Sequence, residues 1–137
     1  ADSPHVVKIT CRTFLDGEEV TGGTGSGTFS VDEPGRKRMT LFVNDGGKND
    51  GHTFDFVKFR LNVDNGTLGV SSKKLDFTKT ARTYGMLNPQ LNTGNPEPIF
   101  VYCMNQDSIS GVDFDRQPIE SIIAEYEQVV VVYLQIN

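Results

Sequence analysis

The stretch NDGGKNDGH, from Asn44 to His52, concentrates glycines and oxygen-bearing side chains in nine residues. Asp45, Asn49 and Asp50 could supply oxygen ligands to Ca²⁺, but the sixth-position glycine and twelfth-position glutamate of an EF-hand loop are both missing. A P-loop is excluded because no hydroxyl residue follows Gly47-Lys48 to reach Mg²⁺. The stretch therefore predicts a hairpin turn, with a loose Ca²⁺ site at Asp45, Asn49 and Asp50 as the alternative.

The sequence contains no recognisable arrangement of catalytic residues. The two histidines, His5 and His52, lie in no nucleophile motif, and no base adjoins a serine or cysteine in a known pattern. Asp113 and Asp115 form a carboxylate pair, but a glycosidase needs two carboxyls facing each other across a cleft. We therefore expect a protein without enzymatic activity and without a cofactor; a small hydrolase with dispersed carboxylates is the least favoured alternative.

Two further segments have a simple structural interpretation. GGTGSG, from Gly22 to Gly27, lacks the GxGxxG spacing and predicts a flexible hairpin tip or a subunit-contact loop. Arg36-Lys37-Arg38 could bind a sulfate, phosphate or carboxylate, although cations at the start of an edge strand more often block unwanted pairing.

The two cysteines, Cys11 and Cys103, lie almost at opposite ends of the chain and match no zinc or redox spacing. Each is in phase with residues expected to face inward, namely Val7 and Ile9 for Cys11, and Ile99 and Val101 for Cys103. Two interpretations stay open: a pair of small buried hydrophobic residues, or a disulfide between the first strand and a late one.

The segment from Thr78 to Pro98 shows no hydrophobic periodicity and contains three prolines. It predicts an irregular arm of about twenty residues, a length that is uncommon unless the loop has a function. Its side chains include residue types enriched in interface anchors, namely Arg82, Tyr84, Met86 and Leu87. These four are the interface candidates, unless Met86 and Leu87 merely cover the core.

The rest of the chain has the periodicity of an antiparallel β protein. Residues His5 to Phe14 alternate apolar and polar, as does the strand expected from Arg36 to Val43. A short strand is expected over Thr28–Val31. In the next strand, His52 to Val63, the apolar phase switches at Phe56-Val57, which predicts a β-bulge or burial on both faces.

Near the C-terminus the pattern changes to that of a helix. Ile119, Ile122, Ile123 and Tyr126 have the spacing of an amphipathic stripe, which predicts a helix over about residues 117–127. A strongly β-branched strand, VVVVYLQIN, follows it. The sequence thus predicts one domain, residues 1–137, folded as an antiparallel sandwich or jelly roll of about seven or eight strands with one short helix.

Charge and composition limit the classes of binding partner that the chain is expected to have. The net charge is −5, so the chain gains nothing from counterion release on nucleic acid, and its longest apolar run is too short to cross a bilayer. We expect neither nucleic-acid binding nor membrane insertion. A single sequon, Asn65-Gly66-Thr67, is compatible with secretion.

These observations favour a structural assembly subunit, such as a virion coat, decoration or tail protein or a surface-filament subunit. Its partners would be copies of itself or other assembly proteins, in a virion or at a cell surface. The alternative is an extracellular adhesin-like module that binds carbohydrate or protein through its glycine-rich tips.

Overall fold

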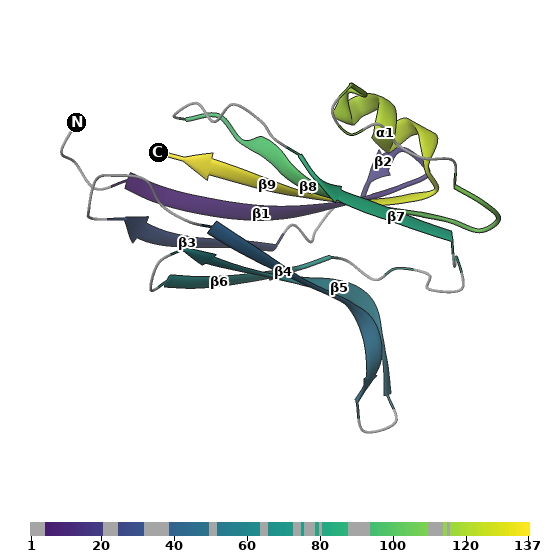
Figure 1. Ribbon diagram of the computed structural model, residues 1–137, viewed down its shortest axis with the longest axis horizontal. Helices are drawn as coiled ribbons and strands as arrows, with labels where there is room; N and C mark the ends of the chain where they lie inside the picture. Colours follow the sequence, from purple (N-terminus) through teal and green to yellow (C-terminus); the bar gives the residue numbers. More distant parts are fainter. Residues whose placement is uncertain are drawn as a thin grey trace.

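The computed structural model of the chain describes residues 5–20, 25–31, 39–49, 52–63, 66–72, 75, 79, 81–87, 94–109, 114 and 116–137. Within them the chain forms two antiparallel sheets and one short helix (Figure 1). The elements are β1 (His5–Leu15), β2 (Glu18–Glu19), β3 (Gly25–Val31), β4 (Met39–Asn49), β5 (His52–Val63), β6 (Gly66–Ser71), β7 (Ala81–Met86), β8 (Glu97–Asn105), α1 (Ile119–Glu125) and β9 (Gln128–Ile136). The predicted antiparallel sandwich is confirmed, whereas the described strands do not establish a jelly roll.

Sheet A, the larger sheet, has the order β2-β1-β9-β8-β7, and β3 pairs with β1 along residues His5 to Cys11. The middle strands β8 and β9 are apolar on successive residues, because both of their faces are buried. Strand β3 begins at Gly25, so the second half of GGTGSG is a paired strand and the prediction of a flexible tip is wrong there. Residues 22–24 lie outside the described part.

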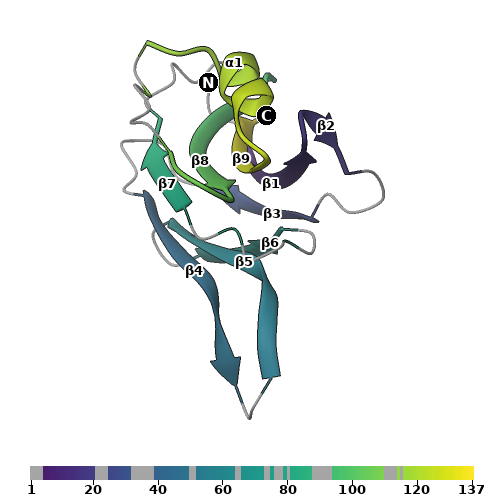
Figure 2. The ribbon, with the colours of Figure 1, turned by 90° about the vertical axis from the view of Figure 1, so that its right-hand side faces the viewer.

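Sheet B has the order β4-β5-β6 and packs against one face of sheet A. The two sheets approach each other most closely where β6 contacts β3 and β1. Figure 2 shows the edge strands β7 and β4 together on the opposite side of the molecule, where the sandwich is open.

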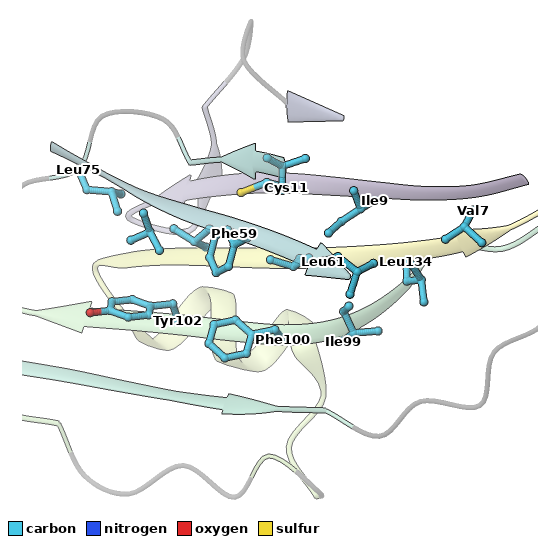
Figure 3. Close-up of a cluster of buried hydrophobic side chains, with 14 of the residues drawn as sticks. Val7, Ile9, Cys11, Phe59, Leu61, Leu75, Ile99, Phe100, Tyr102 and Leu134 are labelled. Atoms are coloured by element: carbon cyan, nitrogen blue, oxygen red, sulfur yellow. The ribbon is translucent and has the colours of Figure 1, made fainter. Parts of the chain in front are cut away.

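An inner cluster of apolar side chains fills the space between the two sheets (Figure 3). Most of its members come from alternate positions of β1, β5, β8 and β9, as the period of two requires, and Val70 of β6 and Leu75 add to them. They include Val7, Ile9 and Cys11 of β1; Val57, Phe59 and Leu61 of β5; Phe100, Tyr102 and Met104 of β8; and Val130, Val132 and Leu134 of β9. Burial of this cluster is the main stabilising contribution to the fold.

An outer cluster covers the other face of sheet A, beneath α1. It consists of Phe14, Val101, Cys103, Ile122, Tyr126, Val129 and Val131, with partly buried neighbours that include Ile119 and Ile123. The predicted stripe of helix α1 is therefore confirmed. The helix is shorter than predicted: Pro118 is its N-cap residue, and Tyr126 already has the extended backbone that leads into β9.

The predicted irregular arm from Thr78 to Pro98 is corrected by the structure. Residues Ala81–Met86 form strand β7, which pairs in register with β8, and β8 itself begins at Glu97. The hydrophobic pattern does not indicate this strand, because its sequence, ARTYGM, does not alternate apolar and polar residues in the usual way.

The stretch NDGGKNDGH continues strand β4 as far as Asn49, which pairs with His52. The antiparallel pairing of β4 with β5 thus continues into the stretch, which confirms the expected hairpin, while residues 50 and 51 lie outside the described part. Past Asp45 and Val57 the pairing shifts, so that two residues of β5 oppose one of β4. This irregularity confirms the predicted β-bulge.

Beyond the bulge, β4 and β5 form a two-stranded ribbon, residues 46–49 and 52–56, which projects from the sandwich (Figure 2). Strand β6 ends where the ribbon begins, since Ser71 pairs with Lys58. At this junction the backbone N–H of Val57 donates to the Ser72 hydroxyl (2.9 Å), and the Ser72 N–H donates to the Val57 carbonyl (2.8 Å). Ser72 thus satisfies the backbone of β5 where the third strand stops.

The two cysteines are free thiols, so the alternative of a Cys11–Cys103 disulfide is not borne out. Both are buried, but Cys11 belongs to the inner cluster and Cys103 to the outer cluster, on opposite faces of sheet A. Strand β9 also separates β1 from β8. The prediction that Val101 and Cys103 share a face with Ile99 is wrong, because an irregularity between Pro98 and Phe100 shifts the phase of β8.

No helix in the described part of the chain is long and apolar enough to cross a membrane.

Candidate functional site

Strand β7 presents three of the four predicted interface residues on one face. Tyr84 is 60% exposed and Met86 58% exposed, and Arg82 is exposed beside them. The Tyr84 ring stacks on the buried Tyr102 ring, with centroids 5.5 Å apart and an interplanar angle of 5°, and lies 6.2 Å from the Phe100 ring. The β7 surface, defined as Arg82, Tyr84 and Met86, is therefore an extension of the inner cluster that reaches the open side of the sandwich.

The opposite face of β7 is closely covered. A Cβ on Gly85 would come within 2.7 Å of two ring carbons of Phe114, so a residue without a side chain is needed for this ring to lie on the strand. Phe114 in turn packs against the outer cluster. Strand β7 is thus packed on one face, whereas its other face exposes Tyr84 and Met86; in the described part of the chain, sheet B has three strands against the six of sheet A.

Leu87, the fourth predicted interface residue, does not join the other three. Its N–H donates to the Ile99 carbonyl (2.8 Å), and its side chain packs against the outer cluster, on the far face of the sheet. The alternative that Leu87 merely covers the core is the correct one for this residue, whereas Met86 is exposed.

A second surface, which the sequence did not point to, lies on the outer face of sheet B. The face carries three rows of residues across the strands: Thr40, Asn62 and Thr67; Phe42, Arg60 and Gly69; Asn44, Lys58 and Ser71. The Arg60 guanidinium lies over the Phe42 ring, 4.5 Å from its centroid. Gly69 leaves the middle row without a side chain on β6, and a hollow of about 590 Å³ opens there. We call it the sheet B hollow.

A charged cluster at the other edge of sheet A, on β1 and β2, has a structural role. The Arg12 side chain forms an ion pair with Glu19, which joins β1 to β2, and its guanidinium lies 5.7 Å and 5.5 Å from the ring centroids of Phe14 and Tyr133. The hydrogen bond from Arg12 lowers the pKa of Glu19. These contacts fasten the short strand β2 beside the outer cluster.

The remaining predicted sites lie outside the described residues. Asp45 and Asn49 belong to β4, but their side chains are not described, and Asp50 lies outside the described residues. The same holds for Arg36, Lys37, Arg38, Asp113, Asp115 and the side chains of His5 and His52. Among the side chains that are described, no group of three or more His, Cys, Asp or Glu residues is placed to hold a metal ion.

Comparisons of the chain with protein-family models, with curated proteins and with solved structures find no match. Function is therefore inferred from the geometry of the two surfaces, the β7 surface and the sheet B hollow.

Proposed function

We propose that this chain is a non-enzymatic assembly subunit that works through protein–protein contacts, as a virion coat, decoration or tail protein or a surface-filament subunit does. The observation that carries the proposal is the β7 surface: an edge strand that exposes Tyr84 and Met86 beside an open backbone edge. The partner we infer is a second copy of the chain.

An edge strand offers N–H and C=O groups that can pair with another strand. Proteins usually protect such edges with charged residues, prolines or bulges; ARTYGM contains no proline or bulge and a single charged residue. Within the described residues, β7 pairs with β8 alone. Its one charged residue, Arg82, donates toward the hydroxyl of Tyr102 (3.5 Å). The strand is therefore suited to accept a further strand from a neighbouring subunit.

Tyr84 has the properties of an interface anchor. Tyrosine, with few rotatable bonds, gives a large contact area at low cost in conformational entropy, and this ring is already ordered by stacking on Tyr102. Met86 adds an adaptable apolar group at the same face. A neighbour that covered both would bury apolar surface and pair the open edge in one contact.

The projecting ribbon supports the same proposal. An isolated two-stranded hairpin is only marginally stable in water, and residues 46–49 and 52–56 extend past the last strand that pairs with them. A neighbouring subunit would supply a surface against which the ribbon can pack. Contacts of this kind, repeated by symmetry, build closed or filamentous assemblies.

The test is the mass of the chain in solution as a function of concentration, measured by multi-angle light scattering. We expect the wild type to rise above the monomer mass of 15.1 kDa. The double substitution Tyr84→Lys, Met86→Lys places two charges on the β7 surface and is expected to weaken association at least about tenfold.

Val6→Lys is the matched control, because it replaces another exposed apolar strand residue, 38% exposed, with the same charge. It should leave association unchanged. A wild type that stays at the monomer mass at every concentration would overturn the proposal, as would equal association of the double variant and the control.

A further inference from the structure

We propose that the sheet B hollow binds a sugar that carries one anionic group, a carboxylate or a sulfate, with Arg60 as the residue that holds the anion. This site lies on a different surface from β7 and does not rest on the proposed assembly role.

Arg60 is positioned to bind an anion. Its contact with the Phe42 ring fixes the side chain but neutralises none of its charge, so its N–H donors stay able to bind a carboxylate or sulfate in a forked geometry. Among the side chains described on this face, none is a carboxylate. Arg60 thus presents a positive charge on this face, in a chain whose net charge is −5.

Gly69 provides the room for the ligand. It lies directly across from Arg60 on β6, where any other residue would occupy the outer face. Thr67 and Ser71, the residues two positions before and after it, place their hydroxyls at the two ends of the hollow. The Thr67 hydroxyl donates to the Asn62 side-chain oxygen (3.1 Å), which leaves its lone pairs available to accept from a ligand.

The size and lining of the hollow indicate the class of ligand. A volume of about 590 Å³ lies within the usual range of small-molecule sites. Its lining includes the hydroxyl residues Thr67 and Ser71, the Asn44 amide, Arg60 and the Phe42 ring, beside apolar residues such as Val43 and Val70, and this mixture suits a sugar ring that carries an anionic group. One guanidinium, that of Arg60, can hold one anionic group in a forked geometry, whereas an extended polyanion would require a longer basic stripe.

The experiment is a titration of the full ¹⁵N-labelled chain, followed by amide chemical shifts, at constant ionic strength. The probes are sodium glucuronate, glucose 6-sulfate, uncharged glucose and inorganic sulfate. We expect saturable shifts centred on Phe42, Arg60 and Gly69 with at least one of the two acidic sugars, and shifts at least about tenfold weaker in apparent affinity with glucose or sulfate. Comparison of the two acidic sugars shows whether the hollow recognises a carboxylate or a sulfate.

Two substitutions test the residues assigned. Arg60→Gln removes the charge, and Gly69→Thr fills the hollow; both should weaken binding at least about tenfold. Gly69→Thr is expected to fold, because a Cβ there would meet only the Phe59 carbonyl oxygen, at an ordinary contact distance of 3.8 Å. Lys8→Gln, a loss of the same charge on β1 of sheet A, is the matched control and should bind as the wild type does.

Three outcomes would overturn the proposal. The first is the absence of localised shifts with both acidic sugars. The second is equal binding of inorganic sulfate, which would make the hollow a simple anion site. The third is unchanged binding in Arg60→Gln and Gly69→Thr, provided that their amide spectra remain dispersed like that of the wild type.

Discussion

The middle strands of sheet A, β8 and β9, are buried on both faces, whereas sheet B is buried on one. The inner cluster covers one face of sheet A, and α1 with the outer cluster covers the other. Sheet B contributes Val57, Phe59 and Leu61 to the inner cluster, and its outer face carries polar and charged residues such as Asn44, Lys58 and Arg60.

This difference explains where the candidate functional residues lie. Side chains in the middle of sheet A are committed to packing, so chemistry or recognition is left to positions that no second layer covers. Among the described residues, these positions include the open face of β7 and the outer face of sheet B. The described part of the chain thus combines a closed framework with accessible surfaces.

The largest expected effect comes from removing the cover of sheet A. Ile122 is fully buried between α1 and the sheet, and Ile122→Ala should lower the free energy of unfolding by about 2–5 kcal/mol, since it removes apolar contacts and leaves a cavity. Chemical denaturation followed by circular dichroism measures this. Glu120→Ala, an exposed position of the same helix, is the control and should change stability by less than about 0.5 kcal/mol.

Equal losses from Ile122→Ala and Glu120→Ala would show that α1 does not close the outer face of sheet A in solution. The stated difference between the two sheets would then be wrong, because sheet A, like sheet B, would have an uncovered face.

A second, smaller effect is expected at the end of sheet B. Ser72→Ala removes the hydroxyl that accepts from the Val57 N–H and leaves this buried donor without its partner, which should cost about 1–3 kcal/mol. Ser71→Ala, the neighbouring residue on the outer face, is the control. Amide hydrogen exchange should become faster at Val57 in Ser72→Ala only; unchanged protection there would contradict the role assigned to Ser72.

Much of this architecture could be predicted from the sequence. The period of two predicted strand β1, and the amphipathic stripe predicted helix α1. The phase switch at Phe56-Val57 predicted the bulge. Each of these patterns reflects local burial of side chains. Residue type also singles out Arg82, Tyr84 and Met86 as interface candidates, which stays a prediction, whereas the strand that aligns them was not predicted.

The rest depends on partners that are distant in sequence. Strand β8 is apolar at successive positions, so periodicity could not tell that Val101 and Cys103 face the helix while Phe100 and Tyr102 face sheet B. The sheet B hollow arises because Phe42, Arg60 and Gly69, from three strands, share one row of the sheet. Register across strands is a tertiary property, and no local pattern in the sequence encodes it.

The two thiols allow the two faces of sheet A to be compared, because Cys11 lies on the face toward sheet B and Cys103 on the face toward α1. The expected effect on stability is the smallest of those considered. Burial raises the pKa of both Cys11 and Cys103 from 9.0 to about 12. Each folded thiol stays neutral while the unfolded one ionises, so this contribution to stability is complete below pH 9 and is lost as the pH rises from about 9 toward about 12. By pH 10 we expect a loss of about 1 kcal/mol for each thiol.

The measurement is the free energy of unfolding between pH 8 and pH 10, for the wild type and for Cys11→Ala and Cys103→Ala. Each variant should lose less stability over this interval than the wild type does, and the variants also correct for Tyr126 and Tyr133, whose pKa values burial raises as well. A chromogenic aromatic disulfide should label neither thiol in the folded chain at pH 8 and both after unfolding. Rapid labelling of Cys103 alone would show that the helix side of sheet A opens while the side facing sheet B stays closed.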